Sequence, residues 1–252
     1  MILSIMKKIW SYCTYSKTFF LLIFILFFVI EYASDIYIDS NTTMAFLIII
    51  LINIILCGYG MTITRDRINN GVRLPKIMVK DIAILGIKSY IVFIVYLYVQ
   101  GFILDWICSP LNFPKFDLED MLLNLQETLH TLYSHNPVDT LVFIIFGSIL
   151  FYITSFFMEI ALARLADTNS IKTAFNVFKI KNDIDTIGWR NYAKEFTAIA
   201  VAIVLFATLK YIVIPVDILN YIWDVFLDLI LFTAQYLGFG AIYSRIKEKK
   251  SN

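Results

Sequence analysis

Four polar residues near the C-terminus are spaced so that they share one face of a predicted helix. They are Asp217, Asp224, Asp228 and Gln235, separated by 7, 4 and 7 residues. Side chains at such intervals lie above one another on a helix. The segment around them is apolar, and a carboxyl group inside a bilayer must be protonated, paired or hydrated because an isolated charge is costly there. The pattern indicates either a path for protons or cations or a set of hydrogen bonds between helices.

Two other apolar segments carry polar residues at similar intervals. These residues are Ser148, Tyr152, Ser155 and Glu159 in one segment, and Tyr96 and Gln100 in the other. If the three rows face one another, they form a polar seam through a helical bundle, in which Asp228 bonds to one of the other rows and Lys88 supplies a counter-charge. Two interpretations stay open: a path for protons, cations or a small solute, or static contacts that hold the helices in register.

No other group of residues matches a catalytic or metal-binding motif. Glu127 and His130 have the spacing ExxH, with His135 nearby, but a zinc protease motif needs two histidines at positions i and i+4. The three cysteines are far apart and have no CxxC or Cys/His companion, so they indicate neither a zinc site nor a disulfide framework. We therefore expect no enzymatic activity, no cofactor and no metal.

The elements that would hold these rows are membrane-spanning helices. Of the 252 residues, 60% are hydrophobic and 16% are charged, so the chain carries more apolar surface than a soluble domain of this size can bury. A helix needs roughly 20 apolar residues to cross a bilayer. Six segments approach this length: 18–33, 44–64, 82–106, 140–162, 192–214 and 219–243. We expect an all-α bundle that forms one membrane domain over residues 1–252.

The first of these segments is the shortest and follows several lysines, an arrangement that also occurs in signal peptides. The residues before Asp35 make a poor cleavage site, because few of them are small. This favours a first helix that is retained in the membrane.

The charges between the segments predict their orientation. All of the 21 lysine and arginine residues except Lys88, Lys115 and Lys210 fall on the same side as the two termini, and the cytoplasmic side of a membrane protein carries the basic excess. We therefore expect a multi-pass protein of the cell membrane with both termini in the cytoplasm. Its basic loops would contact anionic lipid headgroups. The net charge of +1 does not suit nucleic acid as a partner, while a protein partner or a second copy stays open.

Residues 117–133, in the longest outer connection, predict an amphipathic helix. Its leucines recur at helical spacing, at Leu118, Leu122, Leu125, Leu129 and Leu132. Acidic residues such as Glu119 and Asp120 occupy the opposite face. This pattern is typical of a helix that lies flat at a membrane surface.

A short pattern occurs twice, near the cytoplasmic ends of the second and sixth segments. Gly58-Tyr59-Gly60 precedes Arg65, and Gly238-Phe239-Gly240 precedes Arg245 at the same interval. Small residues let membrane helices approach closely. The pattern indicates three repeated helical hairpins or, equally, a coincidence in an apolar background.

The first pattern belongs to a longer set of residues that resembles a known family. In the first block these residues are Gly58, Tyr59, Arg65, Gly71, Leu74 and Pro75, and in the second they are Ala161, Arg164, Ala166, Ser170, Ala174, Phe175, Ile187, Gly188, Trp189 and Tyr192. Together they resemble the membrane-protein family called domain of unknown function 4013, common in archaea. One departure is that Lys76 and Lys80 follow the Leu-Pro pair, where the family commonly has acidic and aromatic residues.

The resemblance implies a helical membrane fold and assigns no catalytic residue. With the absence of a catalytic motif, it favours a non-enzymatic membrane scaffold or subunit. The alternative is a transporter or channel-like protein that uses the polar seam for protons, cations or a small solute.

Overall fold

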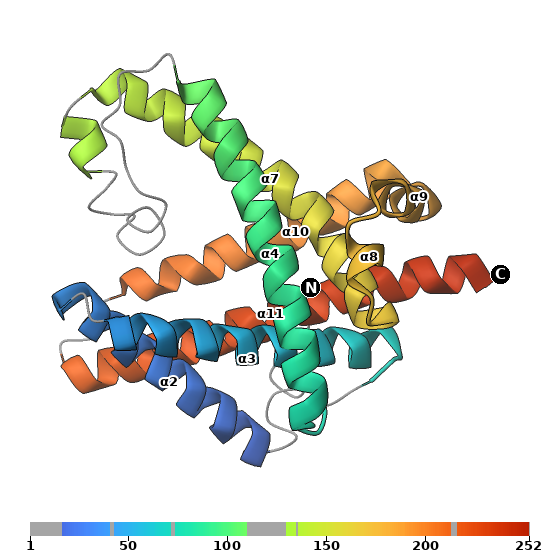
Figure 1. Cartoon of the computed structure of the whole chain (residues 1–252), viewed down its shortest axis with the longest axis horizontal. Coiled ribbons are helices and arrows are strands. Elements are labelled where there is room, and N and C mark those ends of the chain that lie inside the picture. Colours follow the sequence, from blue (N-terminus) through green and yellow to red (C-terminus); the bar gives the residue numbers. More distant parts are fainter. Residues whose placement is uncertain are drawn as a thin grey trace.

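The computed structural model describes residues 17–40, 43–71, 74–109, 130–134, 136–212 and 216–251, and within these ranges it contains helices and no strands (Figure 1). The elements are α2 (Lys17–Ser40), α3 (Thr43–Ile68), α4 (Val79–Cys108), α7 (Pro137–Thr168), α8 (Ile171–Ala174), α9 (Val177–Ile187), α10 (Trp189–Ala207), the 3₁₀ helix η1 (Thr208–Tyr211) and α11 (Asp217–Ser251). The predicted all-α fold is confirmed.

Five stretches of helix are long and apolar enough to cross a membrane. They are α3, α4, α7, most of α11, and Trp189–Lys210, which joins α10 to η1. Each coincides largely with one of the predicted segments from the second to the sixth. The first predicted segment lies in α2, whose apolar stretch, Phe20–Ser34, is shorter than a full span. The protein is therefore membrane-embedded, with five such helices among the described residues where six were predicted.

The amphipathic helix predicted for residues 117–133 falls in the connection between α4 and α7. Residues 110–129 lie outside the described part of the chain, so most of that prediction lies outside it as well; residues 130–134 are helical. Helix α7 then begins at Pro137, where proline loses no hydrogen bond because the first N–H groups of a helix have no partner within it. The side chain of Asn136 accepts hydrogen bonds from the backbone N–H groups of Val138 and Asp139, at 3.1 and 3.3 Å, and caps the helix.

Helix α3 lies at the centre of the bundle. It packs against α2, α4, α7 and α11, and α11 also packs against α2, α9 and α10. Figure 1 shows α4 and α7 leaning away from α2, α3, α10 and α11 on the left, whereas α3, α7 and α11 come together near the C-terminus. The core follows this shape: Met61, Leu165 and Ile246 are buried near the C-terminal ends of their helices, while Leu47 and Ile145 are exposed farther away.

Two glycines let α3 and α4 touch along their backbones. A Cβ atom at Gly58 would lie 2.0 Å from the carbonyl oxygen of Ile82, and one at Gly86 would lie 2.2 Å from that of Ile54. Such distances are too short for non-bonded atoms, so a larger residue at either position would push the helices apart. Small residues at helix crossings have this role in membrane proteins.

The two Gly-X-Gly motifs meet where α3 packs against α11. A Cβ atom at Gly60 would overlap the ring of Tyr236, at 2.4 Å, and one at Gly240 would lie 2.8 Å from the carbonyl oxygen of Thr64. The Thr64 hydroxyl donates a hydrogen bond of 3.0 Å to the carbonyl oxygen of Tyr236. The motifs therefore share one helix contact, and the three-hairpin repeat stays a prediction.

Candidate functional site

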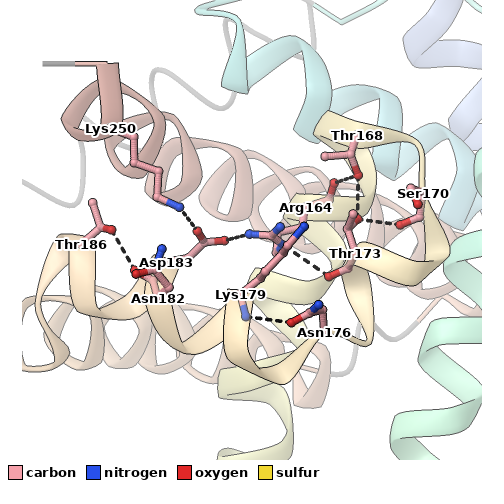
Figure 2. A network of polar contacts seen from close by, with 10 residues as sticks. All are labelled: Arg164, Thr168, Ser170, Thr173, Asn176, Lys179, Asn182, Asp183, Thr186 and Lys250. Carbon is pink, nitrogen blue, oxygen red and sulfur yellow. Dashed lines mark hydrogen bonds and ion pairs between the residues drawn. The ribbon is translucent and has the colours of Figure 1, made fainter.

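A charged cluster is formed by Arg164 of α7, Asp183 of α9 and Lys250 of α11 (Figure 2). Arg164 donates from Nη1 to Oδ2 of Asp183, and Lys250 donates from Nζ to Oδ1. The Asp183 side chain is fully buried. Because each carboxylate oxygen binds its own cation, the cost of burying the negative charge is offset. The cluster thus ties together three helices that are distant in sequence.

Helix α9 carries Asp183 into the core on an apolar face. Ile180, Ile184 and Ile187 are buried against the bundle, and Asp183 lies on the same face because it is three positions from Ile180 and four positions from Ile187. The side chain of Asn176 accepts the backbone N–H of Lys179 at 3.0 Å, which caps the start of α9. Burial of the isoleucines therefore positions the carboxylate between its two cations.

Hydroxyl groups fix the turn that leads from α7 into α8. Thr168 Oγ1 donates to the carbonyl oxygen of Arg164 at 2.8 Å and lies 2.7 Å from Thr173 Oγ1. Arg164 Nε donates to the carbonyl oxygen of Thr173 at 3.3 Å. Figure 2 shows Thr168, Ser170 and Thr173 closing this turn beside the arginine. The guanidinium is therefore held from two sides.

Two basic side chains bind backbone oxygens at the C-terminal end of α7. Arg65 Nε of α3 donates to the carbonyl oxygen of Ala166 at 2.7 Å, and Lys88 Nζ of α4 donates to the carbonyl oxygen and side-chain Oδ1 of Asn169, at 2.7 and 2.9 Å. The last carbonyls of a helix lack partners within it and carry partial negative charge. The expectation that Lys88 is the counter-charge of the seam is therefore wrong, since it caps α7.

Two further ion pairs lie at the same end of the bundle. Arg245 of α11 binds both carboxylate oxygens of Glu195 of α10, and Lys247 Nζ binds Asp167 Oδ1 at 2.8 Å. All of these contacts cross between helices. We call this end of the molecule, defined by Arg65, Lys88 and these pairs together with the charged cluster, the basic end.

The outer face of α9 carries an exposed acid with two partners. Lys181 Nζ and Trp189 Nε1 donate to the carboxylate of Asp185 at 2.9 and 2.6 Å. The hydrogen bond from Lys181 lowers the pKa of Asp185 below its ordinary value, and the hydrogen bond from Trp189 contributes a smaller lowering. Trp189 begins α10, so this contact also links α9 to the next helix across Gly188, whose positive φ of 92° suits glycine.

Asp228 is bound by a lysine rather than by either predicted row. Its two carboxylate oxygens lie 2.7 and 2.8 Å from Lys210 Nζ, and Glu31 Oε1 of α2 lies 3.8 Å from the same nitrogen. Lys210 lies in η1, the element that precedes α11 in the chain. The expectation that Asp228 bonds to the rows on α4 or α7 is therefore wrong: it is paired, as its depth requires, but on the side of α11 that faces η1 and α2.

The other members of the predicted seam are dispersed. Asp224 accepts a hydrogen bond of 3.2 Å from Asn220 on its own helix. Tyr152 bonds to Thr197 of α10 at 2.7 Å, and the Tyr96 ring stacks on Phe175. Among the remaining positions, Ser148 is exposed, and Ser155, Gln100 and Gln235 are half-buried. Asp217 begins α11, and its side chain is not among those that the structure describes.

Glu159 is more deeply buried than the other described residues of the predicted seam. Its side chain is almost completely buried, at 1% exposed. Neither of its carboxylate oxygens has a hydrogen-bond partner among the described residues. It therefore differs from Asp183 and Asp228, which are both bound by cations.

The residues of the family resemblance gather at the basic end. Tyr59 donates its hydroxyl to the carbonyl oxygen of Pro75 at 3.1 Å. Leu74 and Ala174 are buried, and Gly71 N donates to the carbonyl oxygen of Asp66 at 2.8 Å to close the end of α3. With Gly58, Arg65, Arg164, Phe175 and Gly188 described above, these positions build helix contacts and turns.

Asp183 and Lys250 were missed by the sequence reasoning as partners of Arg164. One feature of the sequence could have identified Asp183, because it is an acid in the middle of the isoleucine face of α9. No feature of the sequence distinguishes Lys250, because it is one of several basic residues in the last turns of α11. Tyr192, quoted only for the resemblance, is fully buried and donates its hydroxyl to the carbonyl oxygen of Phe156.

Comparison with known proteins adds one match. The model of a family described as protein of unknown function (DUF4013) matches residues 43–218. No protein with a curated description and no solved structure matches the chain. The matched range contains both blocks of motif residues and most of the basic end.

Proposed function

This chain belongs to the DUF4013 family of proteins of unknown function, and we propose that it is a non-enzymatic membrane scaffold or subunit. In this proposal it lies in the cell membrane with both termini in the cytoplasm, and it presents the basic end there as a fixed surface for a partner. The observation that carries the proposal is the charged cluster, in which buried Asp183 is bound by cations from two other helices.

Fixed contacts support a scaffold because a transporter must let helices move past one another during its cycle. Moving α9 away from α7 or α11 would separate Asp183 from Arg164 or Lys250, and a buried charge that loses a partner is strongly destabilising. The backbone contact at Gly58 and Gly86 adds a second constraint at the same end. The basic end is thus suited to hold one arrangement.

The surface of the basic end supports its placement against cytoplasmic headgroups. Phe178, at the start of α9, is 87% exposed, and Lys172, Lys179 and Lys181 surround it in sequence and are also exposed. Figure 1 views α9 almost end-on while α10 and α11 run across the picture. A helix that lies across the bundle axis with an exposed aromatic ring and lysines fits the boundary of an anionic bilayer.

A second candidate, transport of protons or cations, is favoured by the group around Lys210. Asp228 and Glu31 both lie within 3.8 Å of its nitrogen, and Asp224 is one turn away on α11. Two carboxyl groups thus lie close to one lysine and a third lies one turn away, and ionisable groups at membrane depth often mark an ion path.

Reconstituted vesicles distinguish the two candidates. We expect no proton, sodium or potassium flux above that of protein-free vesicles, and no difference between wild type and Asp228→Asn. The control is Asp105→Asn, which removes an exposed acid near the end of α4. A flux that Asp228→Asn abolishes and Asp105→Asn preserves would replace the scaffold with a transporter.

A further inference from the structure

Glu159 lies on α7, and among the described residues no hydrogen-bond donor or ion-pair partner compensates a charge on its carboxyl group. It is 1% exposed, and both carboxylate oxygens are buried without a hydrogen-bond partner. Burying an ionised carboxylate without partners costs far more than burying a neutral carboxyl group. A glutamate in this position is therefore expected to be uncharged.

Two neighbouring donors, the Tyr192 hydroxyl and the Arg164 guanidinium, bond to groups other than Glu159. The Tyr192 hydroxyl of α10 lies near Glu159 and carries one proton, which it donates to the carbonyl oxygen of Phe156. Arg164, one turn beyond Glu159 on α7, binds Asp183 and the carbonyl oxygen of Thr173. These two side chains therefore do not neutralise Glu159.

Several basic groups on the helices that pack against α7 also have other partners. On α3 and α4, Arg65 and Lys88 bind backbone oxygens at the end of α7. On α11, the partners are Glu195 for Arg245, Asp167 for Lys247 and Asp183 for Lys250. Glu195 of α10 lies close enough to repel a negative charge on Glu159.

We infer that Glu159 is a proton-binding site within the bundle. In this conformation it carries a proton, which removes the charge that neither a hydrogen bond nor a cation compensates. Loss of the proton would place a carboxylate near that of Glu195, and their repulsion would act on the contact of α7 with α10 and α11. The site would therefore couple the pH of the adjacent water to the packing of these helices, independently of whether the protein scaffolds or transports.

Infrared spectroscopy of the full-length protein in lipid tests this inference, because a protonated carboxyl group has a C=O band separate from that of a carboxylate. At neutral pH we expect Glu159→Gln to remove one such band. Glu195→Gln, which changes an acid already paired with Arg245, should preserve it. Raising the pH should remove the same band from the wild-type spectrum, and replacing sodium by choline should leave it unchanged.

Thermal unfolding gives a second readout. Glutamine is close in shape to a neutral glutamic acid, so the melting temperature of Glu159→Gln at neutral pH should equal or exceed that of wild type. An unchanged infrared spectrum in Glu159→Gln, or a band that sodium removes at constant pH, would contradict a proton site. A large fall in melting temperature would likewise show that the glutamate is needed as an ion.

Discussion

At the scale of single residues, the buried acids differ in what neutralises them. Asp183 binds Arg164 and Lys250, Asp228 binds Lys210, and Glu159 has no bonded partner among the described residues. Burial of a charge is offset only by a close opposite charge and by hydrogen bonds to the remaining lone pairs. These three acids should therefore respond differently when their charge is removed.

Asp183→Asn should destabilise the protein strongly. The change leaves Arg164 and Lys250 facing each other without the carboxylate, and breaking a buried ion pair costs roughly 3 to 5 kcal/mol. Thermal unfolding of purified protein in detergent measures the effect. The matched control is Asp185→Asn, two positions away on the exposed side of α9, which should melt close to wild type. Equal melting temperatures for the two variants would show that the cluster does not stabilise the fold.

The sequence predicted that Asp228 must be protonated, paired or hydrated, but it did not identify Lys210 as the partner. An acid at membrane depth must be neutralised, and that requirement can be read from the sequence. The identity of the partner depends on how α11 is rotated about its axis and on where η1 places Lys210 relative to α11. Asp183 was missed for a related reason, because Arg164 and Lys250 come from helices whose mutual placement the sequence does not show.

At the scale of elements, α3 and α4 cross in close contact. A methyl group at Gly58 would lie 2.0 Å from a carbonyl oxygen of α4, so Gly58→Ala must push the helices apart. Overpacking typically costs about 1 to 3 kcal/mol, and a backbone atom cannot move aside as a flexible side chain does. We expect a clear fall in melting temperature.

Gly147→Ala provides the matched control for that substitution. Gly147 also lies in a membrane helix, but its added methyl group would meet only the end of the Leu104 side chain, at 3.8 Å. This is ordinary van der Waals contact, so the variant should melt near wild type. If Gly58→Ala were as stable as Gly147→Ala, the two helices would not touch at the position described.

Most of the elements were predictable because span length is a property of the sequence. The second to sixth predicted segments coincide largely with spanning helices, although α7 and α11 extend well beyond the predicted ends. Those extensions carry Arg164 and Lys250, and they continue past the apolar core because capping and ion pairing replace lipid there. Helix contacts were less predictable, since α3 is apolar around nearly its whole circumference and shows no distinct face.

At the scale of the whole molecule, charge and packing are concentrated at one end. The ion pairs of Arg164, Arg245, Lys247 and Lys250 lie there. Fully buried side chains such as Met61, Leu165 and Ile246 lie at the same end. Toward the other end, α4 and α7 separate from the remaining helices (Figure 1), and many apolar side chains are exposed as lipid-facing residues would be. This asymmetry matches the uneven distribution of lysine and arginine in the sequence.

We propose that the helices cross the membrane with the basic end in the cytoplasm. The most direct test is labelling with a membrane-impermeant maleimide of single-cysteine variants, in a chain whose native cysteines are replaced by alanine. Tyr133→Cys probes an exposed position before α7, and Lys249→Cys probes an exposed position at the basic end. We predict that Tyr133→Cys reacts in intact cells and that Lys249→Cys reacts only after permeabilisation. Reaction of Lys249→Cys in intact cells would place the basic end outside the cytoplasm.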